Sequence, residues 1–178
     1  MRAEPRGDAE QVTQLLGGEA LTVQRIEGEW ARIRTDYGYP GWVRTRELAG
    51  SDVLHAAREY LDAPYEWGGL TAEGIDCSGL VHAAFRRAGH LVPRDADQQE
   101  RAATEIDESQ LRPGDLITYG DERGADHIAF WAGEGHILHA TGRAGVERVV
   151  EETEPDSLRT RRRKLLRASS LVSGSARS

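Results

Sequence analysis

The spacing of apolar residues changes near residue 50, and this change constrains the fold of the 178-residue chain more than any other feature. Between residues 11 and 49, short segments alternate apolar and polar residues and are separated by turns at 17–18, 27–28 and 37–38. Alternation with a period of two is typical of half-buried strands. We therefore expect a small antiparallel all-β barrel over residues 1–50, with strands at 12–16, 20–26, 30–34 and 41–43.

From residue 51 the spacing becomes helical. Ser51 is a candidate cap for a helix that Pro64 ends, and a second apolar stripe runs from Leu80 to Ala88 and stops at Gly89. Beyond residue 114, the pattern predicts strands at 115–119, 127–131, 136–141 and 146–150. Helices followed by an antiparallel sheet indicate an α+β domain over residues 51–168. The remainder, 169–178, is rich in Ser, Gly and Ala, and we expect it to be disordered.

The charge distribution argues against a nucleic-acid partner. The net charge is −7, and six of the 23 basic residues fall between Arg159 and Arg167, so the rest of the chain is more acidic than the total indicates. A nucleic-acid-binding protein needs a basic face. The basic run could contact an anionic partner, although such runs are more often solvated edges.

Composition also bears on compartment. No segment approaches the roughly 20 apolar residues of a membrane helix, and the first residues lack the apolar stretch of a secretory signal. The chain has one cysteine, which excludes an internal disulfide and suits a reducing compartment. We expect a monomeric, cytoplasmic protein without a membrane span, or an exported one if a leader has been trimmed.

The single cysteine, Cys77, lies where a loop is expected to turn into a helix. A helix N-terminus presents unpaired N–H groups and the positive end of the helix dipole, which predicts a pKa lowered toward neutrality and a thiolate nucleophile. Histidines follow in strand-like segments, His127 and His139 among them. A cysteine followed by distant histidines is the order of a papain-like hydrolase.

The strand pattern brings two histidines together. In the segment 127–131, His127 shares a face with Trp131, and residues 133–135 can turn the chain back. If that hairpin pairs Trp131 with Gly135, His127 stands opposite His139. Cys77 would then be the nucleophile, His127 the base and later the acid, and His139 the group that orients His127.

Each of these residues has a plainer interpretation. A lone cysteine is usually a small buried apolar residue, and an inward histidine is usually a satisfied core group. We place the other four histidines in that class: His55, His82, His90 and His136. A zinc site would require three or four ligands at short spacings, and no such spacing occurs, so we expect no metal.

Six short segments surround these residues, in this order: Pro-Tyr-Glu-Trp-Gly-Gly at 64–69, Gly-Ile-Asp-Cys-Ser-Gly-Leu-Val at 74–81, Pro-Arg-Asp-Ala-Asp-Gln-Gln at 93–99, Pro-Gly-Asp-Leu at 113–116, Asp-His-Ile-Ala at 126–129 and Leu-His-Ala at 138–140. Together they resemble the NlpC family of bacterial cell-wall cysteine peptidases, which have a papain-like catalytic domain. The front of the chain, residues 9–43, resembles the bacterial SH3-like barrel that precedes this domain in one branch of the family.

The resemblance implies a reaction and three catalytic residues. That branch cleaves short peptidoglycan peptides between γ-D-Glu and the diamino acid and releases L-Ala-γ-D-Glu, without a cofactor. Cys77, His127 and His139 match the family's triad. Tyr65 matches a tyrosine whose hydroxyl helps to hold the oxyanion, although a loop tyrosine is often only packed.

The resemblance also implies substrate contacts. Asp76 and Ser78 flank the thiol and would help to hold the free amino terminus of the substrate. Asp95 would line the cleft, or alternatively cap a helix that starts near residue 96. From the barrel, Glu10 and Tyr39 would close the cleft and bind the L-Ala ammonium.

Two other functions remain open from the sequence. One is a non-catalytic module that binds peptidoglycan or protein through the barrel. The other keeps the fold and changes the reaction to an amidase or acyltransferase acting on another amide or ester. If the barrel caps the cleft, only free peptides fit, and we expect a role in recycling wall fragments.

Overall fold

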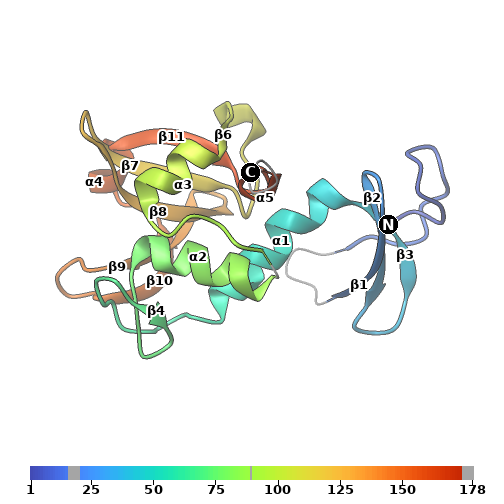
Figure 1. Ribbon diagram of the computed structural model, residues 1–178, viewed down its shortest axis with the longest axis horizontal. Coiled ribbons are helices and arrows are strands. Elements are labelled where there is room, and N and C mark those ends of the chain that lie inside the picture. Colours follow the sequence, from blue (N-terminus) through green and yellow to red (C-terminus); the bar gives the residue numbers. More distant parts are fainter. Residues whose placement is uncertain (16–20, 89, 174–178) are drawn as a thin grey trace. The chain divides into compact units, whose positions relative to one another are not determined.

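The computed structural model describes residues 1–15, 21–88 and 90–173 (Figure 1). The chain divides into two compact units, one from Met1 to Asp52 and the other from Val53 onward. The division lies two residues after the expected boundary at residue 50. Each unit is described by itself below.

The first unit contains a three-stranded antiparallel sheet in the order β1-β2-β3. Its strands are β1 (Leu21–Glu27), β2 (Trp30–Thr35) and β3 (Pro40–Arg44). Strand β2 alternates buried and exposed residues, and its inward side chains Ala31 and Ile33 form a small core with Val43. Three of the four expected strands are therefore present.

The strand expected at residues 12–16 is not formed over residues 12–15, and residue 16 lies outside the described part. The backbone of this segment pairs with the start of the chain instead. The Val12 N–H donates to the Met1 carbonyl, and the amino group of Met1 donates to the Thr13 carbonyl.

The second unit is built on a six-stranded antiparallel sheet in the order β10-β9-β8-β7-β11-β6. Helices α2 (Cys77–Arg87) and α3 (Ala96–Ala102) both pack against β8 (Figure 1). The main core lies between α2 and the sheet, and its fully buried side chains include Phe85, Ile128 and Phe130. The strands are β6 (Thr104–Glu105), β7 (Leu116–Asp121), β8 (Gly124–Gly133), β9 (His136–Thr141), β10 (Arg148–Thr153) and β11 (Arg162–Arg167).

The remaining elements are short, apart from one helix. They are α1 (Thr45–Arg58), the hairpin of β4 (Leu70–Thr71) and β5 (Gly74–Ile75), the 3-10 turn η1 (Glu108–Gln110), α4 (Asp156–Arg159) and α5 (Ser170–Ser173). Helix α1 begins at Thr45, so Ser51 lies inside it and the predicted cap at Ser51 is wrong. The preceding Arg, Glu, Leu and Ala are good helix formers, which allows the helix to start earlier.

The basic run is only in part a solvated edge: Arg159 and Arg161 are exposed, whereas from Arg162 onward the run forms a paired strand. Strand β11 lies between β7 and β6, and its cations neutralise acids of the same unit. Three of these acids are almost fully buried: Glu154 pairs with Arg162, Glu100 with Arg163 and Asp115 with Arg167. A buried carboxylate needs a counter-charge. These three arginines therefore supply the counter-charges for carboxylates in the interior of this domain.

The expected disorder of the C-terminal tail is wrong for residues 170–173, which form α5. Leu171 is only 2% exposed and belongs to the main core. The Ser170 hydroxyl donates to the Arg167 carbonyl and accepts a hydrogen bond from the Thr104 N–H. The apolar side chain of Leu171 and the hydroxyl of Ser170 therefore hold this segment against the rest of its unit. Residues 174–178 lie outside the described part.

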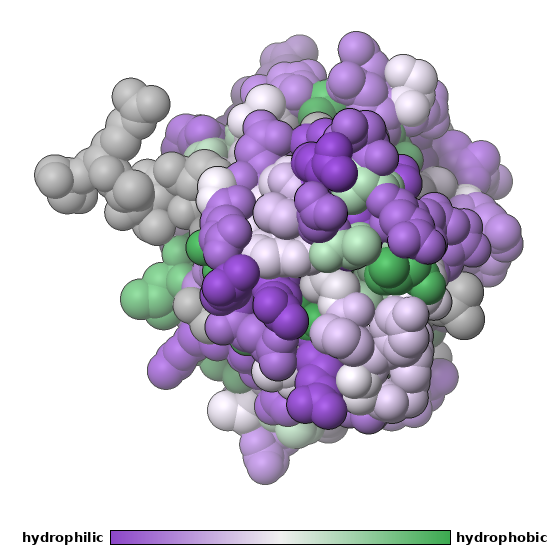
Figure 2. All heavy atoms as spheres, turned by 90° about the vertical axis from the view of Figure 1, so that its right-hand side faces the viewer, coloured by the Kyte–Doolittle hydropathy of each residue, from purple (hydrophilic) through white to green (hydrophobic). Residues whose placement is uncertain are grey.

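Figure 2 shows a face of the molecule on which hydrophilic residues predominate and apolar ones form small, separated patches. Scattered apolar side chains are normal on a protein surface. Within residues 1–15, 21–88 and 90–173, no helix is long and apolar enough to cross a membrane.

Candidate active site

Cys77 is the first residue of α2, as the sequence predicted, and its side chain is buried against the sheet. The preceding Asp76 is the N-cap, and its Oδ1 accepts a hydrogen bond of 2.6 Å from the Gly79 N–H. The pairing of β8 with β9 stops at Phe130. Beyond that point the Ile128 N–H donates to the Cys77 sulfur, so the thiol lies beside the strand position next to His127.

The prediction of a lowered thiol pKa is wrong. Burial, and then the negative charge of Asp76, raise the pKa of Cys77 to about 11, against the hydrogen bonds from the backbone of Ile128, Ser78 and Cys77 itself. The helix N-terminus does not outweigh desolvation at a residue that is 6% exposed. At neutral pH the thiol is therefore protonated and needs a base before it can attack.

His127, His139 and Glu152 form a chain of hydrogen bonds. His127 Nε2 lies 2.8 Å from His139 Nδ1, and His139 Nε2 lies 3.0 Å from Glu152 Oε1. His139 is fully buried, and the ring of Tyr119 packs on His127 with centroids 5.6 Å apart. The two predicted histidines are thus in direct contact. Glu152, which comes from β10, was not identified from the sequence.

The predicted register of the hairpin is wrong by two residues. Trp131 pairs with Ile137 and not with Gly135, because the hairpin closes at Gly133 and His136, later than predicted, and the bulge between Trp131 and Gly133 takes back one residue of that displacement. A shift of two residues keeps each side chain on its face of the sheet, whereas a shift of one would reverse it. His127 and His139 therefore still meet.

Both histidines are neutral at physiological pH. Burial, followed by the neighbouring His139 and Arg161, lowers the pKa of His127 to about 3. Burial also lowers the pKa of His139, although Glu152 opposes that shift. A neutral imidazole is a base that can accept the proton of a protonated thiol as the sulfur attacks.

Asp76 is the centre of a buried hydrogen-bond network. Its Oδ2 accepts from the Gly68 N–H at 2.7 Å, and the Arg94 guanidinium binds both carboxylate oxygens at 2.8 and 2.9 Å. Arg94 also donates to the Ser78 hydroxyl at 3.0 Å. Burial acts to raise the pKa of Asp76, but the bonds from Arg94, Gly79 and Gly68 outweigh it and hold that pKa below its usual range.

This network assigns a structural task to two predicted substrate contacts. Asp76 and Ser78 are 6% and 7% exposed, and both are engaged by Arg94. They tie the loop before the hairpin to the first turn of α2, and their contact with a substrate amino group stays a prediction. Arg94 was missed from the sequence. A buried carboxylate requires a nearby cation, so the need for a positively charged partner of Asp76 was the signal that could have identified Arg94.

Gly79 explains the glycine in the Asp-Cys-Ser-Gly segment. A Cβ at this position would stand 2.3 Å from the Gly69 carbonyl oxygen, closer than any side chain tolerates. The first turn of α2 and the loop therefore approach each other backbone to backbone. This close approach holds the thiol end of the helix against the loop that carries Tyr65.

Tyr65 lies near the thiol. Burial, and then the charges of Cys77 and Asp76, raise the pKa of its hydroxyl, so the phenol is neutral and can donate a hydrogen bond. Its ring packs against Gly142, where a Cβ would lie 2.9 Å from Tyr65 Cε1. The geometry is compatible with the predicted oxyanion role, which stays a prediction.

The other predicted contacts are less constrained. Asp95 stands at the N-cap position of α3 but makes no capping bond; its exposed carboxylate accepts from Gln98 Nε2 at 3.0 Å. Glu10 and Tyr39 are exposed residues of the first unit, and the Tyr39 ring lies 6.4 Å from that of Tyr37. Their role in closing a cleft stays a prediction.

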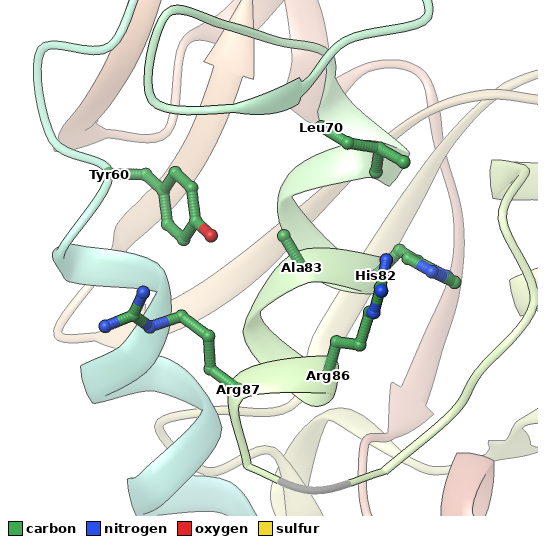
Figure 3. Close-up of a pocket in the computed structure, with 6 residues that line it drawn as sticks. All are labelled: Tyr60, Leu70, His82, Ala83, Arg86 and Arg87. Carbon is green, nitrogen blue, oxygen red and sulfur yellow. The ribbon is translucent and has the colours of Figure 1, made fainter.

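A separate cavity of about 220 Å³ lies beside the later turns of α2 (Figure 3). Arg87 pairs with Glu59 and stacks over Tyr60, and His82 Nδ1 lies 2.8 Å from the Val92 carbonyl oxygen. His82 is thus a satisfied group, and no predicted site residue lines this cavity. Its lining residues are Tyr60, Leu70, His82, Ala83, Arg86 and Arg87.

In the described part of the chain, no three His, Cys, Asp or Glu side chains are grouped to hold a metal ion.

Comparison with known proteins agrees with this architecture. The gamma-D-glutamyl-L-lysine dipeptidyl-peptidase of Bacillus cereus is 29% identical over 71% of this chain and 36% of its own length. The enzyme of the same name from Bacillus subtilis is 33% identical over 55% of this chain and 34% of its own. The chain therefore spans about a third of the length of these relatives.

Solved structures show the same catalytic fold. The P60 domain of an antigen from M. avium subspecies paratuberculosis superposes with a TM-score of 0.60 at 30% identity, covering 69% of this chain and 96% of that one. The peptidoglycan hydrolase RipB from Mycobacterium tuberculosis gives a TM-score of 0.60 at 29% identity, over 69% of this chain and 66% of its own.

Family models cover both units. Residues 1–48 match the bacterial dipeptidyl-peptidase SH3 domain, and residues 62–163 match the NlpC/P60 family. The expected fold class, an α+β papain-like domain preceded by an SH3-like barrel, is confirmed. The chain belongs to the NlpC/P60 family of peptidases.

Proposed function

We propose that this chain is a cysteine peptidase that hydrolyses the bond between γ-D-Glu and the diamino acid in short peptidoglycan peptides with a free N-terminal L-Ala. The observation that carries the proposal is the placement of the single thiol at the Ile128 backbone of β8, one residue from His127, whose imidazole starts the hydrogen-bond chain to the fully buried His139 and on to Glu152. The names of the Bacillus relatives support the γ-D-glutamyl bond as the target.

The reaction follows from the protonation states. The Cys77 sulfur attacks the γ-glutamyl carbonyl carbon while its proton passes to His127. The resulting oxyanion accepts hydrogen bonds from the Tyr65 hydroxyl and the backbone N–H of Cys77. His127 then gives the proton to the departing amine, which leaves a thioester on Cys77. Finally His127 takes a proton from water, the hydroxide attacks the thioester carbonyl, and His127 returns the proton to the departing sulfur, which restores the thiol.

The barrel supplies substrate selection in this proposal. Glu10 accepts the ammonium of L-Ala, and Tyr39 helps to close that end of the cleft. A charge-assisted hydrogen bond contributes about 1.5 to 3 kcal/mol. A peptide that lacks the free ammonium, such as one still attached through its N-terminus to a larger fragment, is then a poor substrate. The enzyme would act on released wall peptides, as expected for recycling.

The test compares free and N-acetylated L-Ala-γ-D-Glu-L-Lys. The free peptide is expected to have a kcat/KM about tenfold to a hundredfold higher, because acetylation removes the ammonium. Glu10→Gln should reduce this preference, whereas Asp8→Asn, in the same loop and paired with Arg6, should not. Equal cleavage of both peptides would remove the selective role of the barrel and leave the catalytic residues unaffected.

A further inference from the structure

Glu152 ends the hydrogen-bond chain that starts at His127. Its Oε1 meets His139 Nε2 at 3.0 Å, and its Oε2 accepts from Arg143 at 2.7 Å. Burial acts to raise the pKa of Glu152, but the bonds from Arg143 and His139 outweigh it and lower that pKa. Glu152 is therefore a carboxylate anion at neutral pH, with both oxygens occupied.

A carboxylate dictates where the protons of this chain lie. An ionised carboxylate can only accept hydrogen bonds, so His139 must carry its proton on Nε2. Neutral His139 then presents a bare Nδ1, which can only accept from His127. His127 must carry its proton on Nε2, which leaves the lone pair of Nδ1 as its basic site. One negative charge thus sets the tautomers of both imidazoles.

We propose that Glu152 is a positioning residue that holds His127 in the tautomer whose Nδ1 accepts the Cys77 proton. This inference rests on the proposed function. Arg143 contributes by keeping the second oxygen of Glu152 engaged, so the carboxylate does not rotate away from His139. When His127 becomes positively charged during the attack, the same carboxylate stabilises that charge through His139.

The geometry distinguishes this role from an ordinary surface ion pair. The neighbouring Glu151 binds Arg58 through two bonds of 2.8 and 2.9 Å and touches neither histidine. Successive residues of a strand point to opposite faces. Glu151 and Glu152 therefore provide a matched pair on one strand: both bind an arginine, and of the two only Glu152 contacts His139.

The decisive variant is Glu152→Gln, because an amide has nearly the same shape but can donate as well as accept. The fixed proton order is then lost, and His127 is expected to populate the tautomer with its proton on Nδ1. We expect kcat to fall by at least about tenfold, the lower end of the loss seen when the partner that orients a metal-bound imidazole is removed, with KM changed by less than about twofold. Glu151→Gln should leave kcat unchanged.

A readout without substrate separates this inference from the proposed function. In ¹⁵N NMR spectra, His127 of the unmutated protein should show a protonated Nε2 and an unprotonated Nδ1, and Glu152→Gln should shift this balance. Alkylation of Cys77 by iodoacetamide at pH 7 should slow in the same variant. Wild-type tautomers and wild-type alkylation in Glu152→Gln would overturn the inference, even if the peptide assay works. The expected spectra in a protein that cleaves no γ-glutamyl peptide would support the inference and refute the proposed function.

Discussion

A His127→Ala protein is expected to keep its fold and to lose peptide hydrolysis by a factor of at least about a thousand in kcat. The thiol is protonated at neutral pH, since the pKa of Cys77 is raised to about 11. Its nucleophilicity therefore depends on a neighbouring base, and the lowered pKa of His127, about 3, keeps that imidazole unprotonated and available. Without it, neither the attack nor the departure of the amine has a proton partner.

The matched control is His136→Ala. His136 lies in the same hairpin and is exposed, and its Nδ1 donates to the Glu134 carbonyl at 3.1 Å. Steady-state kinetics on a γ-D-glutamyl peptide, with circular dichroism to verify folding, compare the two variants. Loss of activity in His136→Ala, or more than about a tenth of the activity retained in His127→Ala, would contradict the assignment of the base.

An Arg94→Leu protein is expected to lose about 3 kcal/mol of unfolding free energy at pH 7, because the change removes one partner of a buried ion pair. The Asp76 side chain is only 8% exposed and relies on Arg94 for two of its hydrogen bonds. Urea denaturation measures the loss. Arg58→Leu is the control: it breaks an equally bidentate pair with Glu151, but both side chains are about 30% exposed, so a loss near 1 kcal/mol or less is expected.

The loss should also depend on pH. In the unmutated protein the pKa of Asp76 lies below its usual range, so the pair contributes stability above pH about 4 that is lost as pH falls through the folded-state pKa. In Arg94→Leu, burial is opposed by fewer partners and raises that pKa. The difference between the two proteins should therefore shrink as the pH falls from 7 toward 3. A difference that stays constant would indicate packing by Arg94 and not charge pairing.

Periodicity predicted the elements of this fold better than it predicted their pairing. The strand at His136–Thr141 and the start of α2 at Cys77 were expected at those positions, because local alternation and the loop-to-helix signal specify them. The register between Trp131 and Ile137 was not, since the position of the turn and the bulge between Trp131 and Gly133 set it together, and neither leaves a mark in the pattern. The contact between the two histidines survived because an even shift preserves the face.

The pKa values and ion pairs of the site could not be predicted from the sequence, for a related reason. The thiol pKa depends on a competition between the helix N-terminus and burial, and burial is a property of the packed domain. Likewise, Arg94 and Glu152 act through contacts with residues 18 and 13 positions away, respectively, in the chain. Strand β11 was not predicted because most of its residues are cations, which suggest a solvated segment. The buried acids that pair with these cations lie far away in the chain.

The most direct test of the central claim is mass spectrometry of L-Ala-γ-D-Glu-diaminopimelate after incubation with the protein and with its Cys77→Ala variant. The same peptide with an ordinary α-linked glutamate serves as the second substrate. We predict release of L-Ala-γ-D-Glu by the unmutated protein from the γ-linked peptide alone, and no product with Cys77→Ala. Equal cleavage of the α-linked peptide, or product formed by Cys77→Ala, would contradict the account.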